Sequence, residues 1–311
     1  MNILEFGSGY EKEVEFSTSF FLYHISKKSL YFVSIDTYLL TFAKQTPKNT
    51  FMNNIIKSVN LIYYSPTGTS RKIARAIGDG LKVNDLSESD ITFKNNEINV
   101  FQENSLTVFV APVYGGRIPP QFFERLGEIN GNGAMCVVVV VYGNRHYDDA
   151  LLELKNEVLK RGFRPIAAAT FIGEHSFSRE NMPVAAGRPD HYDIGMAEHF
   201  GKEVIDKINT VANPGELYVP GNFPYKEIKP KQPVAPQSTD ACCSCGLCIP
   251  ACPTHAIYMD DENNIITDTD TCTLCCACVK ICPNGARIFD TPFTKFLYEN
   301  FSERKNPEFY F

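Results

Sequence analysis

Short apolar runs alternate with amphipathic stretches between residues 57 and 210. The run 59–64 is followed by a polar turn and then by residues 71–81, whose apolar positions recur at helical spacing. Further strands are expected at 107–111, 135–141 and 166–172, and a weaker one near 90–93 or 98–101. Helices are expected near 120–128, 148–161 and 192–209. Strands that alternate with helices predict an α/β domain with a doubly wound, five-stranded parallel sheet.

The regular pattern stops on both sides of this region. Six prolines between residues 211 and 238 predict an extended linker over 211–237 and a domain boundary. Residues 1–56 are rich in Phe and Tyr, but charged residues interrupt their most apolar run, so we expect neither a membrane span nor a signal peptide. Met52 directly precedes the first strand, and we expect residues 1–51 to be an upstream extension with little structure. The aromatic tail 293–311 could pack back on the body.

Ten of the eleven cysteines lie between residues 242 and 282. Two runs share the spacing Cys-x2-Cys-x2-Cys-x3-Cys-Pro, the first beginning at Cys242 and the second at Cys272. This spacing resembles that of the bacterial two-cluster ferredoxins over about residues 238–292, and implies a small α+β domain with two 4Fe–4S clusters. Zinc would not need two complete four-cysteine runs, and a disulfide framework suits a short secreted chain.

In such a domain, three cysteines of one loop reach one cluster, and the fourth cysteine, before proline, ligates the other. One predicted ligand set is therefore Cys242, Cys245, Cys248 and Cys282. The other is Cys272, Cys275, Cys278 and Cys252. Cys243 and Cys276 are out of register and are expected to be small buried side chains, and Cys136 is expected in the core.

Charge and cysteine content limit which classes of partner and which cellular compartment are expected. The formal net charge of −6 argues against nucleic acid. Residues 238–292 carry seven acids and two bases, which either steer the domain to a basic patch on a redox partner or only keep its surface solvated. So many thiols need a reducing compartment, and we expect a cytoplasmic protein.

Three turns at the carboxyl ends of predicted strands could bind a cofactor. The first, 65–70, opens a helix with hydroxyl groups and backbone N–H donors suited to a phosphate, although it could be an ordinary capped helix start. It has neither the lysine of a Walker loop nor three glycines, so ATP and NAD are not indicated. The other two, 112–119 and 142–148, each place an aromatic residue beside glycine.

These turns resemble those of the flavodoxins over about residues 57–210, which implies FMN. The resemblance assigns the phosphate to Ser65, Thr67, Gly68, Thr69 and Ser70. It assigns one side of the flavin ring to Tyr114, Gly115 and Gly116, and the other side to Gly143, Asn144 and Tyr147. The chain has no Trp to stack on the ring, so Tyr114 would substitute for it. Arg145 and His146 are expected to be solvated, and the long polar loop 174–189 to be a lid or docking site.

The whole layout is similar to that of the single-chain flavodoxin–ferredoxin fusions of anaerobic microbes. It implies an iron–sulfur flavoprotein that passes single electrons between two 4Fe–4S clusters, FMN and a redox protein partner. We nominate no catalytic residue, since the chemistry belongs to the cofactors. Two alternatives stay open: an FMN-dependent reductase of a small quinone or nitro compound, and a redox subunit that docks on a larger complex.

Overall fold

The computed structural model describes residues 24–26, 29–31, 56–93, 98, 104–211, 215–228, 230 and 232–311. The chain divides into two units, Met1–Met52 and Asn53–Phe311. In the first unit, β1 (His24–Ser26) and β2 (Ser29–Tyr31) form an antiparallel hairpin. Otherwise the expected upstream extension and the expected start at Met52 lie outside the described residues.

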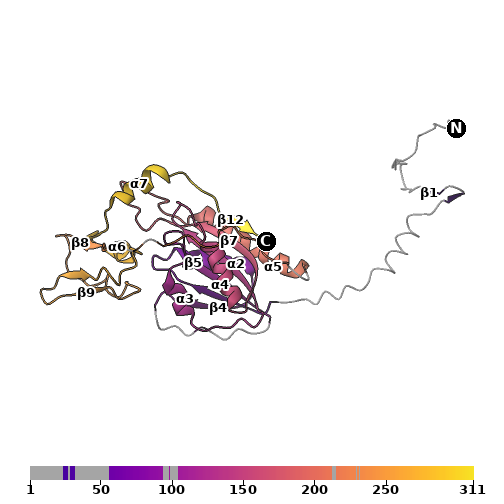
Figure 1. Cartoon of the computed structure of the whole chain (residues 1–311), viewed down its shortest axis with the longest axis horizontal. Coiled ribbons are helices and arrows are strands. Elements are labelled where there is room, and N and C mark those ends of the chain that lie inside the picture. Colours follow the sequence, from indigo (N-terminus) through magenta and orange to yellow (C-terminus); the bar gives the residue numbers. More distant parts are fainter. Residues whose placement is uncertain are drawn as a thin grey trace. The chain divides into compact units, whose positions relative to one another are not determined.

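The second unit is built on a six-stranded sheet with the order β12-β7-β6-β5-β3-β4 (Figure 1). Its strands are β3 (Ser58–Tyr63), β4 (Asp85–Asp90), β5 (Ser105–Pro112), β6 (Met135–Tyr142), β7 (Arg164–Ile172) and β12 (Glu308–Tyr310). The first five of these pair in parallel, which confirms the predicted doubly wound sheet. The sixth strand, β12, comes from the C-terminal tail and pairs antiparallel with β7, an addition that the apolar pattern did not predict.

The prediction for the second strand was wrong in position. The strand is β4, whereas residues 91–93 form the turn that follows it, and most of 98–101 lies outside the described residues. The sequence of β4 is Asp-Leu-Ser-Glu-Ser-Asp, and it pairs only with β3 at one edge of the sheet. Because an edge strand buries few side chains, its apolar pattern is weak.

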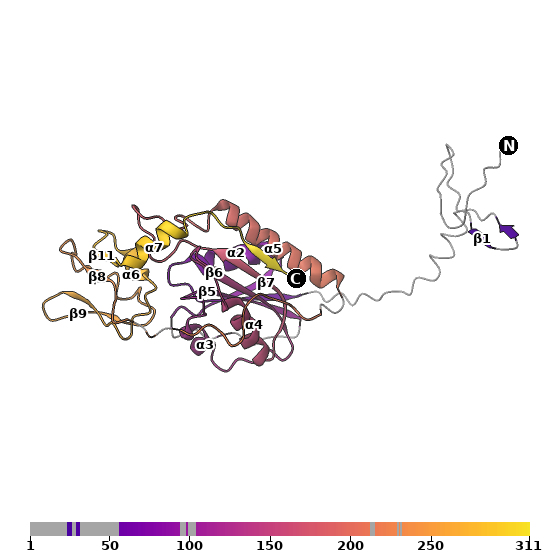
Figure 2. The same cartoon turned by 45° about the horizontal axis from the view of Figure 1, so that its top comes forward.

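Two helices cover each face of the sheet. Figure 2 shows α2 (Thr69–Leu81) and α5 (His191–Thr210) on one side, and α3 (Pro120–Leu126) and α4 (Ala150–Lys160) on the other. Alternate residues of the central strands enter two separate apolar cores, as expected when both faces are covered. Glycines let α2 and α5 pack closely: a Cβ on Gly80 would lie 2.0 Å from the carbonyl oxygen of Glu198, and one on Gly201 would lie 2.3 Å from that of Ile77.

The cysteine-rich part contains short antiparallel strands and a short helix, in agreement with the predicted small α+β domain. β8 (Gln237–Ser238) pairs with β11 (Arg287–Ile288), and β9 (Ile257–Met259) pairs with β10 (Ile265–Thr267). A short helix, α6 (Ala277–Ile281), lies within the second cysteine run. The buried Arg287 side chain connects the strands: it donates to Ser238 Oγ, to the carbonyl of Pro236 and to Thr267 Oγ1.

The linker contains neither helix nor strand in its described part before β8, and it lies along the sheet domain. Leu217 and Val219 enter the apolar core beside α4. The carboxylate of Asp149 accepts hydrogen bonds from the backbone N–H groups of Asn222 (2.8 Å) and Lys226 (2.6 Å). These contacts hold an otherwise irregular segment in place.

After the last cysteine the chain returns to the sheet domain through α7 (Pro292–Asn300). We call the following segment, residues 301–311, the strap. It ends in β12, where Phe309 packs between Phe171 and Phe200, with ring centroids 5.8 and 4.9 Å away. The expectation that the aromatic tail could pack back on the body is confirmed.

Candidate functional site

The turn between β3 and α2 has the geometry of an anion site. Gly68 adopts φ 82° directly before the first helical residue, a conformation that favours glycine. The hydroxyl of Ser65 accepts a hydrogen bond from the backbone N–H of Arg71 (3.0 Å). Ser70 is fully buried, and its Oγ has no partner among the described residues. A phosphate at this helix N-terminus would satisfy that hydroxyl and the first backbone N–H groups, so the residues fit the expected group.

The second turn is shaped by its glycines. Tyr114 and Arg117 exchange backbone hydrogen bonds of 2.9 and 3.1 Å across it. Gly115 and Gly116 have φ of 61° and 94°, and a Cβ on Gly116 would lie 2.2 Å from Asp148 Oδ2. Burial raises the pKa of the Tyr114 phenol well above its usual range, and the nearby Cys275 thiol adds to the shift. Tyr114 therefore lies next to the second cysteine run.

Only one of the three residues assigned to the third turn lines the cavity. Gly143 borders the same cavity as Tyr114, but the side chains of Asn144 and Tyr147 are turned to the strap. The Asn144 Nδ2 donates to the carbonyls of Phe301 (2.6 Å) and Glu303 (2.8 Å). The Tyr147 hydroxyl is 2.8 Å from Glu308 Oε2 and 3.0 Å from the hydroxyl of Tyr310. In this structure neither side chain lines the cavity where the flavin ring was expected.

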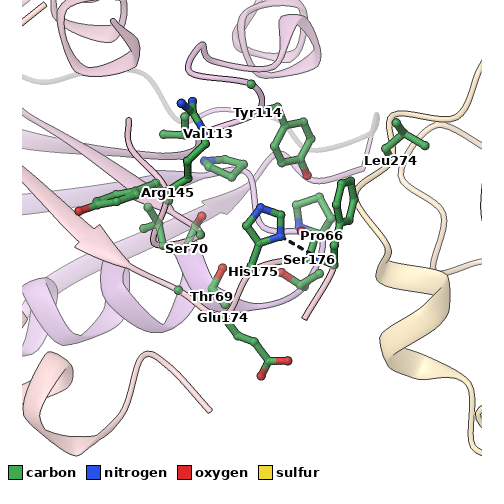
Figure 3. Close-up of a pocket in the computed structure, with 18 of the residues that line it drawn as sticks. Pro66, Thr69, Ser70, Val113, Tyr114, Arg145, Glu174, His175, Ser176 and Leu274 are labelled. Carbon is green, nitrogen blue, oxygen red and sulfur yellow. Dashed lines mark hydrogen bonds between the residues drawn. The ribbon is translucent and has the colours of Figure 1, made fainter. Parts of the chain in front are cut away.

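The three turns surround one cavity of about 240 Å³ (Figure 3). Of the predicted flavin residues, it is lined by Ser65, Thr67, Thr69, Ser70, Tyr114, Gly115, Gly116 and Gly143. Pockets that enclose a drug-sized ligand typically measure about 300–1,000 Å³. A flavin bound here would therefore be tightly enclosed or would keep one edge outside.

The cavity also has walls that sequence analysis did not assign to the site. His175, Ser176 and Phe177 come from the loop after β7, which was expected only to be a lid or docking site. Their position along the chain could have indicated this role, because they follow β7, whose carboxyl end lies beside that of β6 in the sheet. Arg145 and His146, expected to be solvated, line the cavity as well.

The cysteine-rich domain supplies the remaining wall. Thr273 and Leu274 line the cavity, and they are the two residues between Cys272 and Cys275. In Figure 3, Leu274 lies on a separate ribbon that faces Tyr114. The cavity thus lies directly beside one loop of predicted cluster ligands.

Polar contacts join the two domains around this wall. Lys280 of α6 forms an ion pair with Glu174 and lies 3.3 Å from the carbonyl of Ser178. Arg179 lies 3.6 Å from Asp290, and Arg125 donates to the carbonyl of Pro253 at 2.5 Å. Together these contacts hold the Leu274 loop against the cavity.

The eight predicted ligands all lie among the described residues. We call Cys242, Cys245, Cys248 and Cys282 the outer cysteine group, and they line a common cavity of about 20 Å³. We call Cys252, Cys272, Cys275 and Cys278 the inner cysteine group, and all four are buried. Burial raises the pKa of Cys278, and its neighbours Cys272 and Cys252 add to the shift, while Arg287 opposes it. Cys252 packs in one apolar cluster with Cys272 and Cys278, and the crossed ligand pattern stays a prediction.

Burial also raises the pKa of the Cys275 thiol to about 12. Such thiols need a cation to become thiolates, and cluster iron would supply that charge, so the donor set fits iron–sulfur ligation. Burial opposes ionisation of Cys282 as well, but backbone N–H groups of Arg287, Asn284 and Ala286 lower its pKa. Within the described ranges, no group of His, Cys, Asp or Glu side chains has the geometry to hold a single metal ion.

The remaining cysteines behave differently from one another. Cys276 is buried at φ 57°, and Cys136 is fully buried in β6, as expected. Cys243 was expected to be buried but is exposed, and its sulfur accepts a hydrogen bond from Asn284 Nδ2 at 3.3 Å. The loop around the outer cysteine group is at the surface, so an out-of-register side chain there points to solvent.

Comparison with known families agrees with this geometry. The family model described as Flavodoxin matches residues 61–178, and the model described as 4Fe-4S binding domain matches residues 236–258 and 265–288. The chain therefore combines a flavodoxin domain with a ferredoxin domain of the 4Fe–4S type. This is the layout of the flavodoxin–ferredoxin fusions, an electron-transfer class of iron–sulfur flavoprotein.

Three solved structures are among those similar to part of this chain. A flavodoxin from the domain Archaea has 14% identity and a TM-score of 0.38, and the match covers 49% of this chain and 98% of that one. Oxidised Flavodoxin 1 from Bacillus cereus has 14% identity and a TM-score of 0.35, with coverages of 48% and 97%. Rubredoxin oxygen:oxidoreductase from Desulfovibrio gigas has 11% identity and a TM-score of 0.36, with coverages of 57% and 40%.

No curated protein matched the sequence. In the part of the chain that the structure describes, no helix combines the length and the apolar character needed to cross a membrane.

Proposed function

We propose that this chain is an electron carrier in which an external redox protein meets the outer cysteine group and the FMN site meets the inner one. The observation that carries the proposal is the position of Thr273 and Leu274. They lie between two inner ligands and line the cavity formed by the flavin turns. FMN holds one or two electrons, so it would couple one-electron cluster chemistry to a two-electron partner.

The burial of the cysteines supports the same order of electron transfer, from the external partner through the outer and inner groups to the flavin. Every member of the inner cysteine group is buried, whereas Cys245 is exposed and Cys242 and Cys282 are half-buried. Leu247 and Ile281, beside the outer group, are each 50% exposed. A partner can therefore approach the outer group closely, while the inner group is shielded from solvent by protein. Because electron transfer weakens steeply with distance, the outer group is the natural contact point.

The protein's own residues position the groups. The 65–70 turn would bind the phosphate, Tyr114, Gly115, Gly116 and Gly143 would border the ring, and the two cysteine groups would each hold one 4Fe–4S cluster. We place these in a flavodoxin-like domain at 57–210 and a ferredoxin domain at 238–292, joined by the linker 211–237 and followed by the tail 293–311. Ligation by thiolates favours a reducing compartment, and we propose the cytoplasm.

The test begins with anaerobic purification and quantitation of iron, sulfide and flavin. We expect about eight irons and eight sulfides, the content of two 4Fe–4S clusters, and one FMN per chain. Cys275→Ser should remove the inner cluster and slow reduction of the flavin by a reduced ferredoxin in stopped-flow mixing. Cys243→Ser is the matched control and should retain the wild-type iron content and rate. Flavin reduction at the wild-type rate in Cys275→Ser, with the inner cluster lost, would contradict the proposed order.

The small-acceptor reductase is a weaker alternative. It needs space beside the flavin for a quinone or nitro compound, and a cavity of about 240 Å³ is already small for the flavin. Saturable turnover with such an acceptor would favour the reductase. The subunit alternative rests on α7, where Phe293 and Phe296 are 45% and 46% exposed, and stable co-purification with a partner would favour it.

A further inference from the structure

His175 presents one defined hydrogen-bond donor to the cavity. Its Nδ1 accepts a hydrogen bond from the backbone N–H of Phe177 at 3.0 Å. A neutral imidazole carries a single proton, so an Nδ1 that accepts leaves Nε2 as the N–H donor. The backbone fixes the residue further, because His175 N donates to the carbonyl of Val184 and Ser178 N donates to that of His175.

The surroundings keep this ring neutral. Burial is the main cause that lowers the pKa of His175 to about 4, and the positive charges of Arg145 and Lys280 add to it. Glu174 is the nearest acidic neighbour in sequence, but its carboxylate is paired with Lys280 and accepts from Gly187 N at 3.0 Å. Near neutral pH, the residue is therefore a donor of one fixed tautomer.

The imidazole packs against the third of the three turns that surround the cavity, at Gly143. A Cβ on Gly143 would lie 2.4 Å from His175 Cδ2, the ring carbon next to Nε2. Figure 3 shows the ring inside the cavity, with the nitrogen that is not bonded to the Phe177 backbone turned inward. No described residue accepts a hydrogen bond from Nε2. A polar donor that borders the cavity and has no acceptor among the described residues can donate to a bound ligand.

We infer that His175 is a flavin-binding residue whose Nε2–H donates a hydrogen bond to an acceptor atom of the isoalloxazine ring. The inference rests on the proposed FMN site. It favours the ring over the phosphate because the imidazole packs against Gly143, which was assigned to the ring, whereas the phosphate belongs at the N-terminus of α2. Negative charge builds on the flavin ring when it takes up electrons, so a donor there stabilises the reduced form and raises the flavin reduction potential.

The variants are His175→Phe, which keeps an aromatic ring but loses the donor, and His175→Gln, which retains an N–H donor. His199→Phe is the matched control, because His199 is exposed on α5 and remote from the cavity. Flavin affinity is measured by fluorescence quenching on the full-length, cluster-loaded chain. The flavin reduction potential is measured by spectroelectrochemical titration.

We expect His175→Phe to bind FMN and riboflavin about 2- to 13-fold more weakly, as the loss of one hydrogen bond predicts. An equal loss for both flavins assigns the bond to the ring, whereas a loss for FMN alone would assign it to the phosphate and overturn the inference. The potential should fall in His175→Phe and stay near the wild-type value in His175→Gln. Wild-type affinity and potential in His175→Phe would also overturn it.

A second measurement does not depend on the variants. With ¹⁵N-labelled histidine, FMN binding to the wild-type chain should shift the Nε2–H resonance of His175, and no shift would refute the contact. The proposed function is judged separately: if the wild-type chain binds no FMN at all, the flavin site itself fails. If FMN binds and only the His175 effects are absent, the function stands and this inference alone is wrong.

Discussion

Asn144 offers a direct test of what the third turn does. The sequence predicts a flavin contact, but in the structure the side chain is 1% exposed and its amide donates to two strap carbonyls. Replacing Asn144 by Gly removes both hydrogen bonds and keeps a residue that tolerates φ 65°. Replacing it by Ala removes the same bonds and also strains the backbone.

The magnitudes follow from these contacts. A net contribution of about 0.5–1.5 kcal/mol per hydrogen bond predicts that Asn144→Gly lowers the free energy of holding the strap by about 1–3 kcal/mol. Asn144→Ala should cost about 1–2 kcal/mol more, because an alanine in the left-handed region is strained. Flavin affinity should fall less than strap stability, since the amide lies outside the cavity.

Native-state hydrogen exchange is the appropriate assay, because it reports local opening of β12. Protection of the amides of β12 should fall in Asn144→Gly and fall further in Asn144→Ala. Unchanged protection in β12, together with a large loss of FMN affinity, would refute the strap role and restore the flavin contact predicted from the sequence.

Three further predictions concern stability. Arg188→Met should cost about 3–5 kcal/mol in urea unfolding, because it removes the two-pronged ion pair to Asp193, whose side chain is 0% exposed, and leaves Arg304 Nη2, 3.8 Å away, as a weaker partner. Gly80→Ala should cost about 1–3 kcal/mol in the same assay, because its Cβ would lie 2.0 Å from the carbonyl oxygen of Glu198. The flavin-free chain should lose stability as the pH falls from about 6.5 to about 4. In this range His175 is protonated in the unfolded chain but not in the folded chain, where its pKa is about 4. Chemical denaturation across this range measures the loss.

Matched variants separate these effects from general damage. The double variant Arg188→Met/Asp193→Leu should recover much of the loss, and no recovery would contradict the lost Arg188–Asp193 ion pair as its cause. Gly195→Ala, at an exposed helical position with open space around it, should leave stability equal or higher. His175→Gln should weaken the pH dependence of the free energy of unfolding between about pH 6.5 and about pH 4. An unchanged pH dependence would assign the loss of stability to other groups.

The fold of the sheet domain could be predicted because its strands are buried on both faces. Such strands read as continuous apolar runs, and β5 and β6 have almost no exposed side chain. The edge strand β4 and the added strand β12 could not be placed. One buries little, and the pairing of the other with β7 depends on a segment more than a hundred residues away.

The cluster ligands could also be predicted, because ligand spacing along the chain is itself a geometric constraint on a metal cluster. The flavin turns were predictable in position but not in detail. Backbone direction at a strand end follows from sheet topology, but the direction of one side chain depends on what packs beside it. Asn144 and Tyr147 turn to the strap for this reason.

The sequence by itself thus determined the doubly wound class of the sheet and the positions of the three turns, and it predicted the two cysteine sets, because each depends on local pattern or on spacing. Only the tertiary structure decided what surrounds the cavity. Leu274 comes from a cysteine loop 160 residues beyond Tyr114, and His175 from a loop with no recognisable motif. Local sequence does not specify such neighbours: Leu274 reaches the cavity only when the two domains pack together, and His175 only when the loop after β7 folds over the sheet edge.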